Sequence, residues 1–152
     1  MSLENEINQR KFRNEYQKSA INIIYTHNWM AEKMNKLFDE WDITAQQFNI
    51  LRILRGAGQP LSTLQIRQRM LDRMSDTSRI VDRLVRKGLV KKSICKLDRR
   101  LVDVVITDKG KKLLEKIDQY SEQMDAIMKN LTEQEAQTLN ELLDKIRNAK
   151  DE

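Results

Sequence analysis

The hydrophobic pattern of the chain changes period at Gly88, and this change limits the folds open to it. Before Gly88, apolar residues recur every three or four positions, which is the spacing of an amphipathic helix. After it, residues 89–95 and 101–106 are rich in β-branched residues and read as strands, with the charged residues 96–100 between them. The pattern predicts a β-hairpin directly after a helix.

Two short helices are expected just before this hairpin. Ser62 and Gln65 have the spacing of a capping box, which predicts a helix running to about Leu71. Ser75 is expected to cap the next helix, which Gly88 ends. Because the turn between the two helices is short, the segment has the form of a helix-turn-helix.

Further helices are expected on both sides of this segment. One covers residues 9–41, and a second begins at Thr44 and stops at Gly56. Another covers residues 107–131, and the last begins at a capping box that starts with Thr132.

These elements predict a mainly α fold with a small β-hairpin wing. We expect an N-terminal dimerisation helix in residues 1–43, a winged helix-turn-helix core in 44–106, and C-terminal dimerisation helices in 107–152. A core of roughly 60 residues cannot cover the apolar stripes of both arms, so we expect the arms to pack in a homodimer as one intertwined unit. A monomer whose long helices fold back on the core is the alternative.

Positive charge is concentrated in the middle of the chain. Residues 62–105 hold 12 Lys and Arg against five Asp and Glu, whereas the whole chain has a net charge of only +5. A concentrated basic segment is typical of a phosphate-binding surface. An ordinary solvated surface is the alternative, and charge alone does not decide between them.

Two segments resemble the MarR family. Residues 98–110, DRRLVDVVITDKG, are similar to its wing signature of D-x-R, alternating apolar residues and L-T-x-x-G, with Ile106 in place of the usual Leu. Residues 77–90, TSRIVDRLVRKGLV, are similar to its recognition helix and the exit into the wing. The order of elements also matches over nearly the whole chain. The resemblance implies an obligate dimer on a pseudo-palindromic operator, often released by a small ligand or by oxidation.

In a helix-turn-helix, the N-terminal residues of the second helix lie nearest the bases in the major groove. The residues expected to contact DNA from this helix are Ser75, Thr77, Ser78, Arg79 and Arg83. Arg79 is the best candidate for a bidentate contact with guanine. Arg83 and Arg86 are suited to phosphate contacts or to pairing with Asp82 or Asp72. Asp76 is expected to assist the helix N-terminus.

The tip of the wing carries Asp98, Arg99 and Arg100. Either arginine suits a narrow minor groove, where negative potential is concentrated. The resemblance implies that Arg100 enters the groove and that Asp98 holds the loop in shape through a salt bridge or a backbone bond. A charged tip that only keeps a strand edge soluble is the alternative.

The resemblance also implies a pocket for a small-molecule effector between the dimerisation helices and the core. The residues that would line it are His27, Trp29, Met30, Met34, Phe38 and Phe48. Ordinary core packing explains the same stripe of Met and aromatic residues, so the pocket is a hypothesis.

The sequence lacks the features of an enzyme. It contains no Gly-rich phosphate loop and one histidine, and it has no cluster of metal ligands, so neither a cofactor nor a metal is expected. The lone Cys95 excludes an internal disulfide and is interpreted as an incidental residue or a redox switch beside basic residues.

Together these features predict a double-stranded DNA-binding transcriptional regulator, acting as a repressor. No apolar run approaches the roughly 20 residues of a membrane helix, so we expect a cytoplasmic, nucleoid-associated protein and no membrane partner. A nonspecific architectural DNA-binding protein and a winged-helix protein-interaction module are the alternatives.

Overall fold

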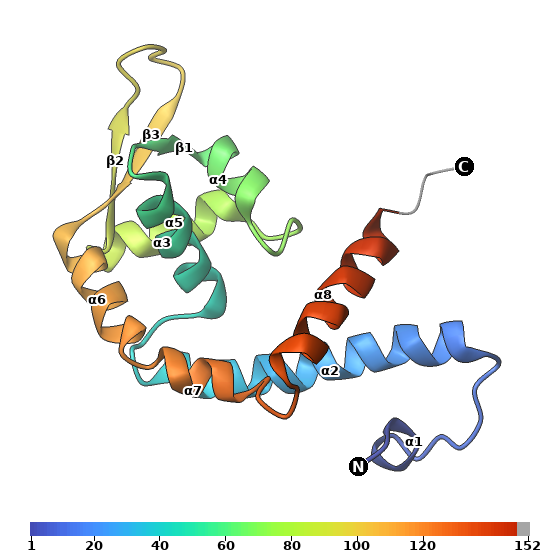
Figure 1. Cartoon of the computed structure of the whole chain (residues 1–152). Coiled ribbons are helices and arrows are strands. Elements are labelled where there is room, and N and C mark those ends of the chain that lie inside the picture. The colour runs from blue at the N-terminus through green and yellow to red at the C-terminus, as the bar shows by residue number, and fades with distance from the viewer. Residues whose placement is uncertain (149–152) are drawn as a thin grey trace. The chain divides into compact units, whose positions relative to one another are not determined.

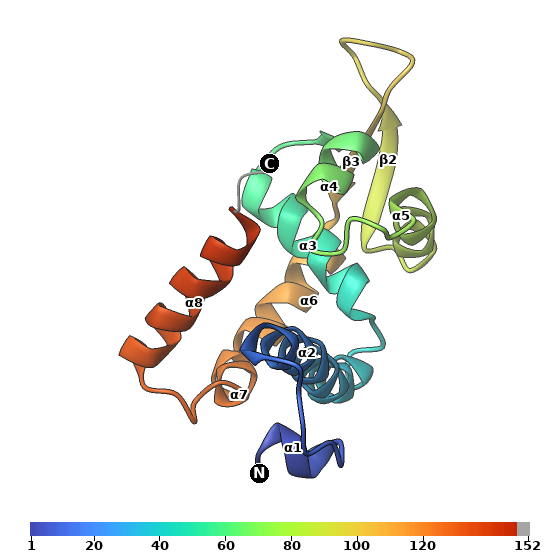
Figure 2. The same ribbon diagram turned by 90° about the vertical axis from the view of Figure 1, so that its right-hand side faces the viewer.

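A computed structural model of the chain describes residues 1–148 and places three helices against a small antiparallel sheet (Figures 1 and 2). The elements of this winged core are α3 (Ala45–Ala57), β1 (Leu61–Ser62), α4 (Thr63–Arg69), α5 (Thr77–Arg86), β2 (Val90–Ile94) and β3 (Val102–Ile106). The sheet order is β1-β3-β2, and the loop joining β2 to β3 projects away from the three helices. The fold confirms a mainly α chain with a β-hairpin wing.

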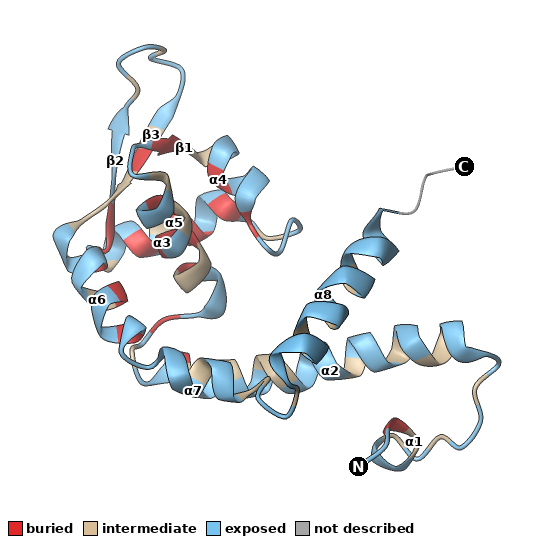
Figure 3. Ribbon diagram, in the orientation of Figure 1, coloured by how far each residue is buried: buried red, intermediate tan, exposed pale blue. Residues whose placement is uncertain are grey.

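The buried residues gather where these helices meet the sheet (Figure 3). The fully buried side chains of this core are Ile50, Leu51, Leu61, Ile66, Val81, Leu84, Val90 and Val104. Each sits at the helical or strand spacing that turns one face of its element inward. Removing this aliphatic surface from water supplies the main driving force that holds the core together.

Two of the three helices of the core, α3 and α4, begin at predicted capping boxes. Thr44 accepts a hydrogen bond from the Gln47 amide at 3.1 Å, and the Gln47 side chain accepts one from the Thr44 amide at 3.1 Å. Ser62 and Gln65 make the same reciprocal pair ahead of α4. Gly58 ends α3 with a φ of +64°, a left-handed conformation that glycine adopts without a steric penalty.

The helix predicted over residues 9–41 is present but shorter, as α2 (Glu15–Asp39). A short helix, α1 (Leu3–Glu6), precedes it, and the backbone between the two is irregular, with a φ of +53° at Asn8. Asn14 then caps α2 by accepting a hydrogen bond from the Gln17 amide at 2.9 Å.

The prediction of one continuous helix over residues 107–131 was wrong. The structure has α6 (Asp108–Asp118) and α7 (Ser121–Ala126), followed by α8 (Glu133–Arg147), which begins at the predicted capping box of Thr132. Between α6 and α7, the amides of Gln119 and Tyr120 bond to carbonyls three residues back, which tightens the turn and interrupts the helix.

The chain divides into two compact units, Met1–Leu114 and a second that begins at Glu115. The winged core lies wholly in the first unit. Within residues 1–148, no helix is long and apolar enough to cross a bilayer.

The start of α6 packs against the backbone that leaves α5. Gly88 has a φ of +72°, and its carbonyl accepts a hydrogen bond from the Thr107 hydroxyl at 2.7 Å. The Thr107 amide donates to the Leu89 carbonyl at 3.0 Å. A Cβ placed on Gly110 would lie 2.3 Å from that same carbonyl oxygen. The approach of α6 to this backbone therefore requires glycine at position 110.

We expect Gly110→Ala to destabilise the protein by about 1–3 kcal/mol, because either α6 or the backbone at Leu89 must move to admit the methyl group. Urea unfolding at a fixed protein concentration measures this change. Gly56→Ala is the matched control, since nothing lies within 4 Å of its added Cβ and alanine favours the helix there. Equal stability of Gly110→Ala and the wild type would contradict the close approach.

Candidate nucleic-acid interface

Helix α5 begins one residue later than predicted. Asp76, not Ser75, caps it, by accepting a hydrogen bond from the Arg79 amide at 3.2 Å. The Ser75 hydroxyl instead donates to the Asp72 carbonyl at 2.7 Å, within the turn that precedes the helix. The expectation that Asp76 assists the helix N-terminus is confirmed.

One face of α5 is exposed and basic. Arg79, Arg83 and Arg86 lie at spacings of four and three residues, which place them on one side of the helix. All three are exposed, and the ion pairs found within residues 1–148 include none of them. Their guanidinium groups are therefore free of carboxylate partners in the described chain. Ser78 is exposed beside Arg79 at the N-terminal end.

Thr77 is a correction to the predicted contact residues. It is only 2% exposed, and its hydroxyl is buried with no hydrogen-bond partner among the described residues. The reason is its position: Thr77 shares the inward face of α5 with Ile80, Val81 and Leu84, at the i, i+3, i+4 and i+7 spacing. Its side chain packs into the core instead of meeting a groove.

Two lysines tie α5 to its neighbours. Lys92 of β2 forms an ion pair with Asp82, so the helix and the wing are joined through side chains as well as through the chain. At the other end of α5, the Lys87 ammonium donates to the Asp42 carbonyl and lies 3.3 Å from the Gln47 side-chain oxygen. Asp82 is thereby occupied by a lysine and does not pair with Arg83 or Arg86.

The tip of the wing is organised by Asp98. Its carboxylate accepts hydrogen bonds from the Arg100 amide at 3.0 Å and from Nε and Nη2 of the same residue at 3.1 Å each. Both the salt bridge and the backbone bond named as alternatives are present. These bonds, those from the Arg100 side chain foremost, hold the pKa of Asp98 below its usual value. Arg99 and Arg100 are exposed at the tip.

The residues expected in a ligand pocket occupy different environments. Phe38 is buried, and its ring centroid lies 4.7 Å from that of Phe48 and 6.4 Å from that of Trp41. The other members are half-buried or exposed: His27, Trp29, Met30 and Met34. Trp29 lines a groove beside α1 that contains neither Phe38 nor Phe48. The Phe38–Phe48 contact is core packing, and the effector pocket stays a prediction.

Cys95 lies just past the end of β2, where its amide bonds to the Leu101 carbonyl at 3.0 Å, and it is half-buried. The expected position within a strand was therefore one residue off. In the part of the chain that the structure describes, no group of three or more His, Cys, Asp or Glu residues is arranged to hold a metal ion.

The sequence did not predict an apolar rim beside the N-terminal end of α5, which is formed by the exposed side chains of Met74 and Leu64. Met74 is 93% exposed and Leu64 is 60% exposed. Ile66, not Leu64, is the buried residue of α4. Both exposed side chains border a cleft of about 480 Å³ whose lining residues are Thr63, Leu64, Arg67, Met74, Ser75, Asp76, Thr77 and Ser78.

Comparisons with family models and with known proteins both identify MarR-family relatives. A family model described as MarR family matches residues 41–101, from the end of the first long helix into the wing. The multiple antibiotic resistance protein MarR of Salmonella typhimurium is 32% identical over 127 residues, which are 82% of this chain and 88% of the relative. The HTH-type transcriptional regulator PecS of Dickeya dadantii is 28% identical over 116 residues, covering 74% and 70% of the two chains.

One solved structure is similar to this chain over almost the full length of the solved chain. A cysteine-to-serine mutant of MarR from E. coli, complexed with operator DNA, has a TM-score of 0.81 and 28% identity, over 90% of this chain and 99% of that one. Fold, basic helix, wing and relatives therefore agree, and this chain belongs to the MarR family of DNA-binding transcriptional regulators.

Proposed function

We propose that the protein represses transcription by binding a pseudo-palindromic operator as a homodimer, with α5 in the major groove and the wing in the adjacent minor groove. The observation that carries the proposal is the free basic face of α5, formed by Arg79, Arg83 and Arg86. The operator complex of the E. coli relative supports it, since that structure has a similar fold over 90% of this chain. We place this activity in the cytoplasm, on the nucleoid.

Each part of this surface has a role in the proposal. Arg79, next to the N-terminal end of α5, hydrogen-bonds a guanine edge, and Ser78 contacts the same base step or its phosphate. Arg83 and Arg86 neutralise backbone phosphates. Arg100 leaves or shares its Asp98 partner to enter the minor groove, where an A·T tract concentrates negative potential. The contacts to bases give specificity, and those to phosphates give position.

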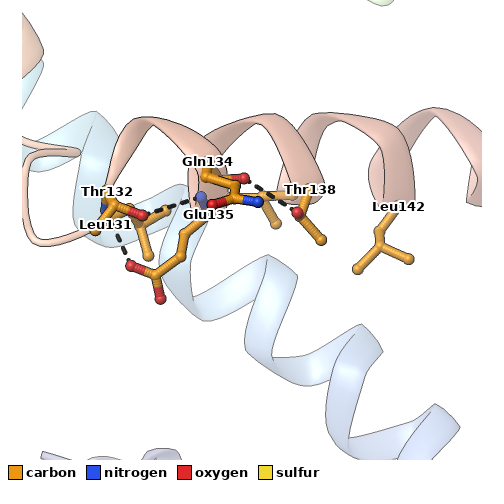
Figure 4. Close-up of a pocket in the computed structure, with 7 residues that line it drawn as sticks. Leu131, Thr132, Gln134, Glu135, Thr138 and Leu142 are labelled. Carbon is orange, nitrogen blue, oxygen red and sulfur yellow. Dashed lines mark hydrogen bonds between the residues drawn. The ribbon is translucent and has the colours of Figure 1, made fainter.

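Exposed apolar surface on α8 supports the homodimer. Among the residues that the structure describes, none in α7 or α8 is fully buried, and Leu142 and Ile146 of α8 are each more than half exposed. Figure 4 shows the N-terminal end of α8, where Leu142 lies on the helix beyond the Thr132–Glu135 capping box. A groove of about 500 Å³ runs along this part of α8, and its lining residues are Leu131, Thr132, Gln134, Glu135, Thr138, Leu139 and Leu142. A second copy of the chain would cover this apolar surface.

Release by a small molecule is the finer part of the proposal. An effector that binds among His27, Trp29, Met30 and Met34 of α2 would act on the helix that precedes the winged core. Nothing in the proposal for DNA binding depends on it.

We expect selection from a random DNA library at near-physiological salt to enrich an inverted repeat with half-sites about one helical turn apart. Arg79→Ala should relax the preference at one base pair of each half-site, at a cost of about 1–3 kcal/mol, because the bidentate contact with guanine is lost. Affinity for the enriched sequence, measured against random DNA, gives this change.

The control for this selection is Arg10→Ala, which removes the same charge outside the helix-turn-helix and the wing. It should keep both the motif and the affinity. An architectural protein would instead yield no motif and only a steep dependence on salt, and an interaction module would not retain DNA at all. Either outcome would contradict the proposed function.

We expect Leu142→Glu to weaken the homodimer by more than about tenfold, because a buried carboxylate without a partner is costly at an apolar interface. Sedimentation equilibrium over a dilution series measures the dissociation constant. Asn140→Glu adds the same charge on a different face of α8 and should leave it unchanged. Equal dimerisation of the two variants would exclude this surface from the interface.

A further inference from the structure

The apolar rim beside α5 lies within the surface assigned to DNA. Met74 and Leu64 border the cleft that also contains Asp76 and Ser78, at the end of α5 nearest the bases. Met74 belongs to the turn that leads into the helix, two residues before its cap. Its side chain is 93% exposed, so it is directed to solvent in the free chain. A long aliphatic side chain at this place needs an apolar counterpart when DNA binds.

B-DNA offers few apolar groups to a protein. Phosphates present charged oxygens, and base edges in the major groove present mainly hydrogen-bond donors and acceptors. The exception in the major groove is the C5-methyl group of thymine. An aliphatic side chain beside the N-terminal end of a recognition helix therefore has one favourable partner in that groove.

The charges of the cleft point to the same partner. Arg67 and Asp76 both line the cleft, and the Asp76 carboxylate also accepts the capping hydrogen bond from the Arg79 amide. With one cation and one anion the cleft is neutral, and the carboxylate disfavours a phosphate at this position. A neutral base edge that carries a methyl group fits such a cleft better than the DNA backbone does.

We propose that the cleft between α4 and the N-terminal end of α5 reads a thymine, with the thymine methyl group packed against Met74 and Leu64. The inference rests on the proposed function, since it assumes that α5 enters the major groove of an operator. It adds a specificity-determining contact outside the helix itself, made by the turn of the helix-turn-helix.

The test replaces thymines of the selected operator, one at a time, with deoxyuridine, which removes the methyl group and keeps every hydrogen-bonding atom. Wild-type protein should lose about three- to fivefold in affinity at one thymine of each half-site, as expected for one buried methyl group. In Met74→Ala the same replacement should cost clearly less than in the wild type, because the methyl group then contacts Leu64 alone.

The control is Leu71→Ala. Leu71 lies in the same turn and is 86% exposed, but it does not line the cleft. This variant should retain the full sensitivity to deoxyuridine. All three proteins should melt at the same temperature, since both side chains are exposed and their removal leaves the core intact.

Three outcomes would overturn the inference: no thymine in the half-site, wild-type affinity that ignores deoxyuridine everywhere, or equal sensitivity of Met74→Ala and the wild type. In each of these cases an enriched operator still exists, so the proposed function stands. If the selection enriches no operator, the proposed function fails and the inference fails with it.

Discussion

The geometry of the proposed DNA-binding surface depends on the backbone junction that follows α5. Gly88 turns the chain with a positive φ, and Thr107 bonds to the carbonyls of Gly88 and Leu89 from the far end of the hairpin. Gly110 lets α6 approach the same backbone. Helix α5, the base of the wing and helix α6 therefore meet at two consecutive residues, Gly88 and Leu89. This junction fixes the basic helix beside the base of the basic wing.

Much of the fold could be predicted because its helix starts are encoded locally. Thr44, Ser62 and Thr132 each form a capping box with a residue three positions on, and each starts a helix in the structure. The later start of α2 and the interruption between α6 and α7 were missed because the apolar spacing continues through both places. Strand β1 has two residues, which is too short to show any period, and it exists through its pairing with β3.

The candidate site was predictable in its charge and less so in its contacts. Arg79, Arg83, Arg86 and the wing arginines are exposed as a DNA-binding surface requires. Ser75 and Thr77 differ from expectation for separate reasons. The cap of α5 lies one residue after Ser75, and Thr77 falls on the inward face that Ile80, Val81 and Leu84 define. Met74 was overlooked because a turn residue has no periodic pattern, and only the folded chain shows its exposure beside the cleft.

The central claim is that α5 and the wing read two adjacent grooves together. Dimethyl sulfate footprinting of the selected operator tests it directly, because the reagent modifies guanine N7 in the major groove and adenine N3 in the minor groove. The account predicts protected guanines in each half-site and protected adenines beside them, with only the adenine protection lost in Arg100→Ala. Adenines that are modified equally with and without protein, beside protected guanines, would contradict it.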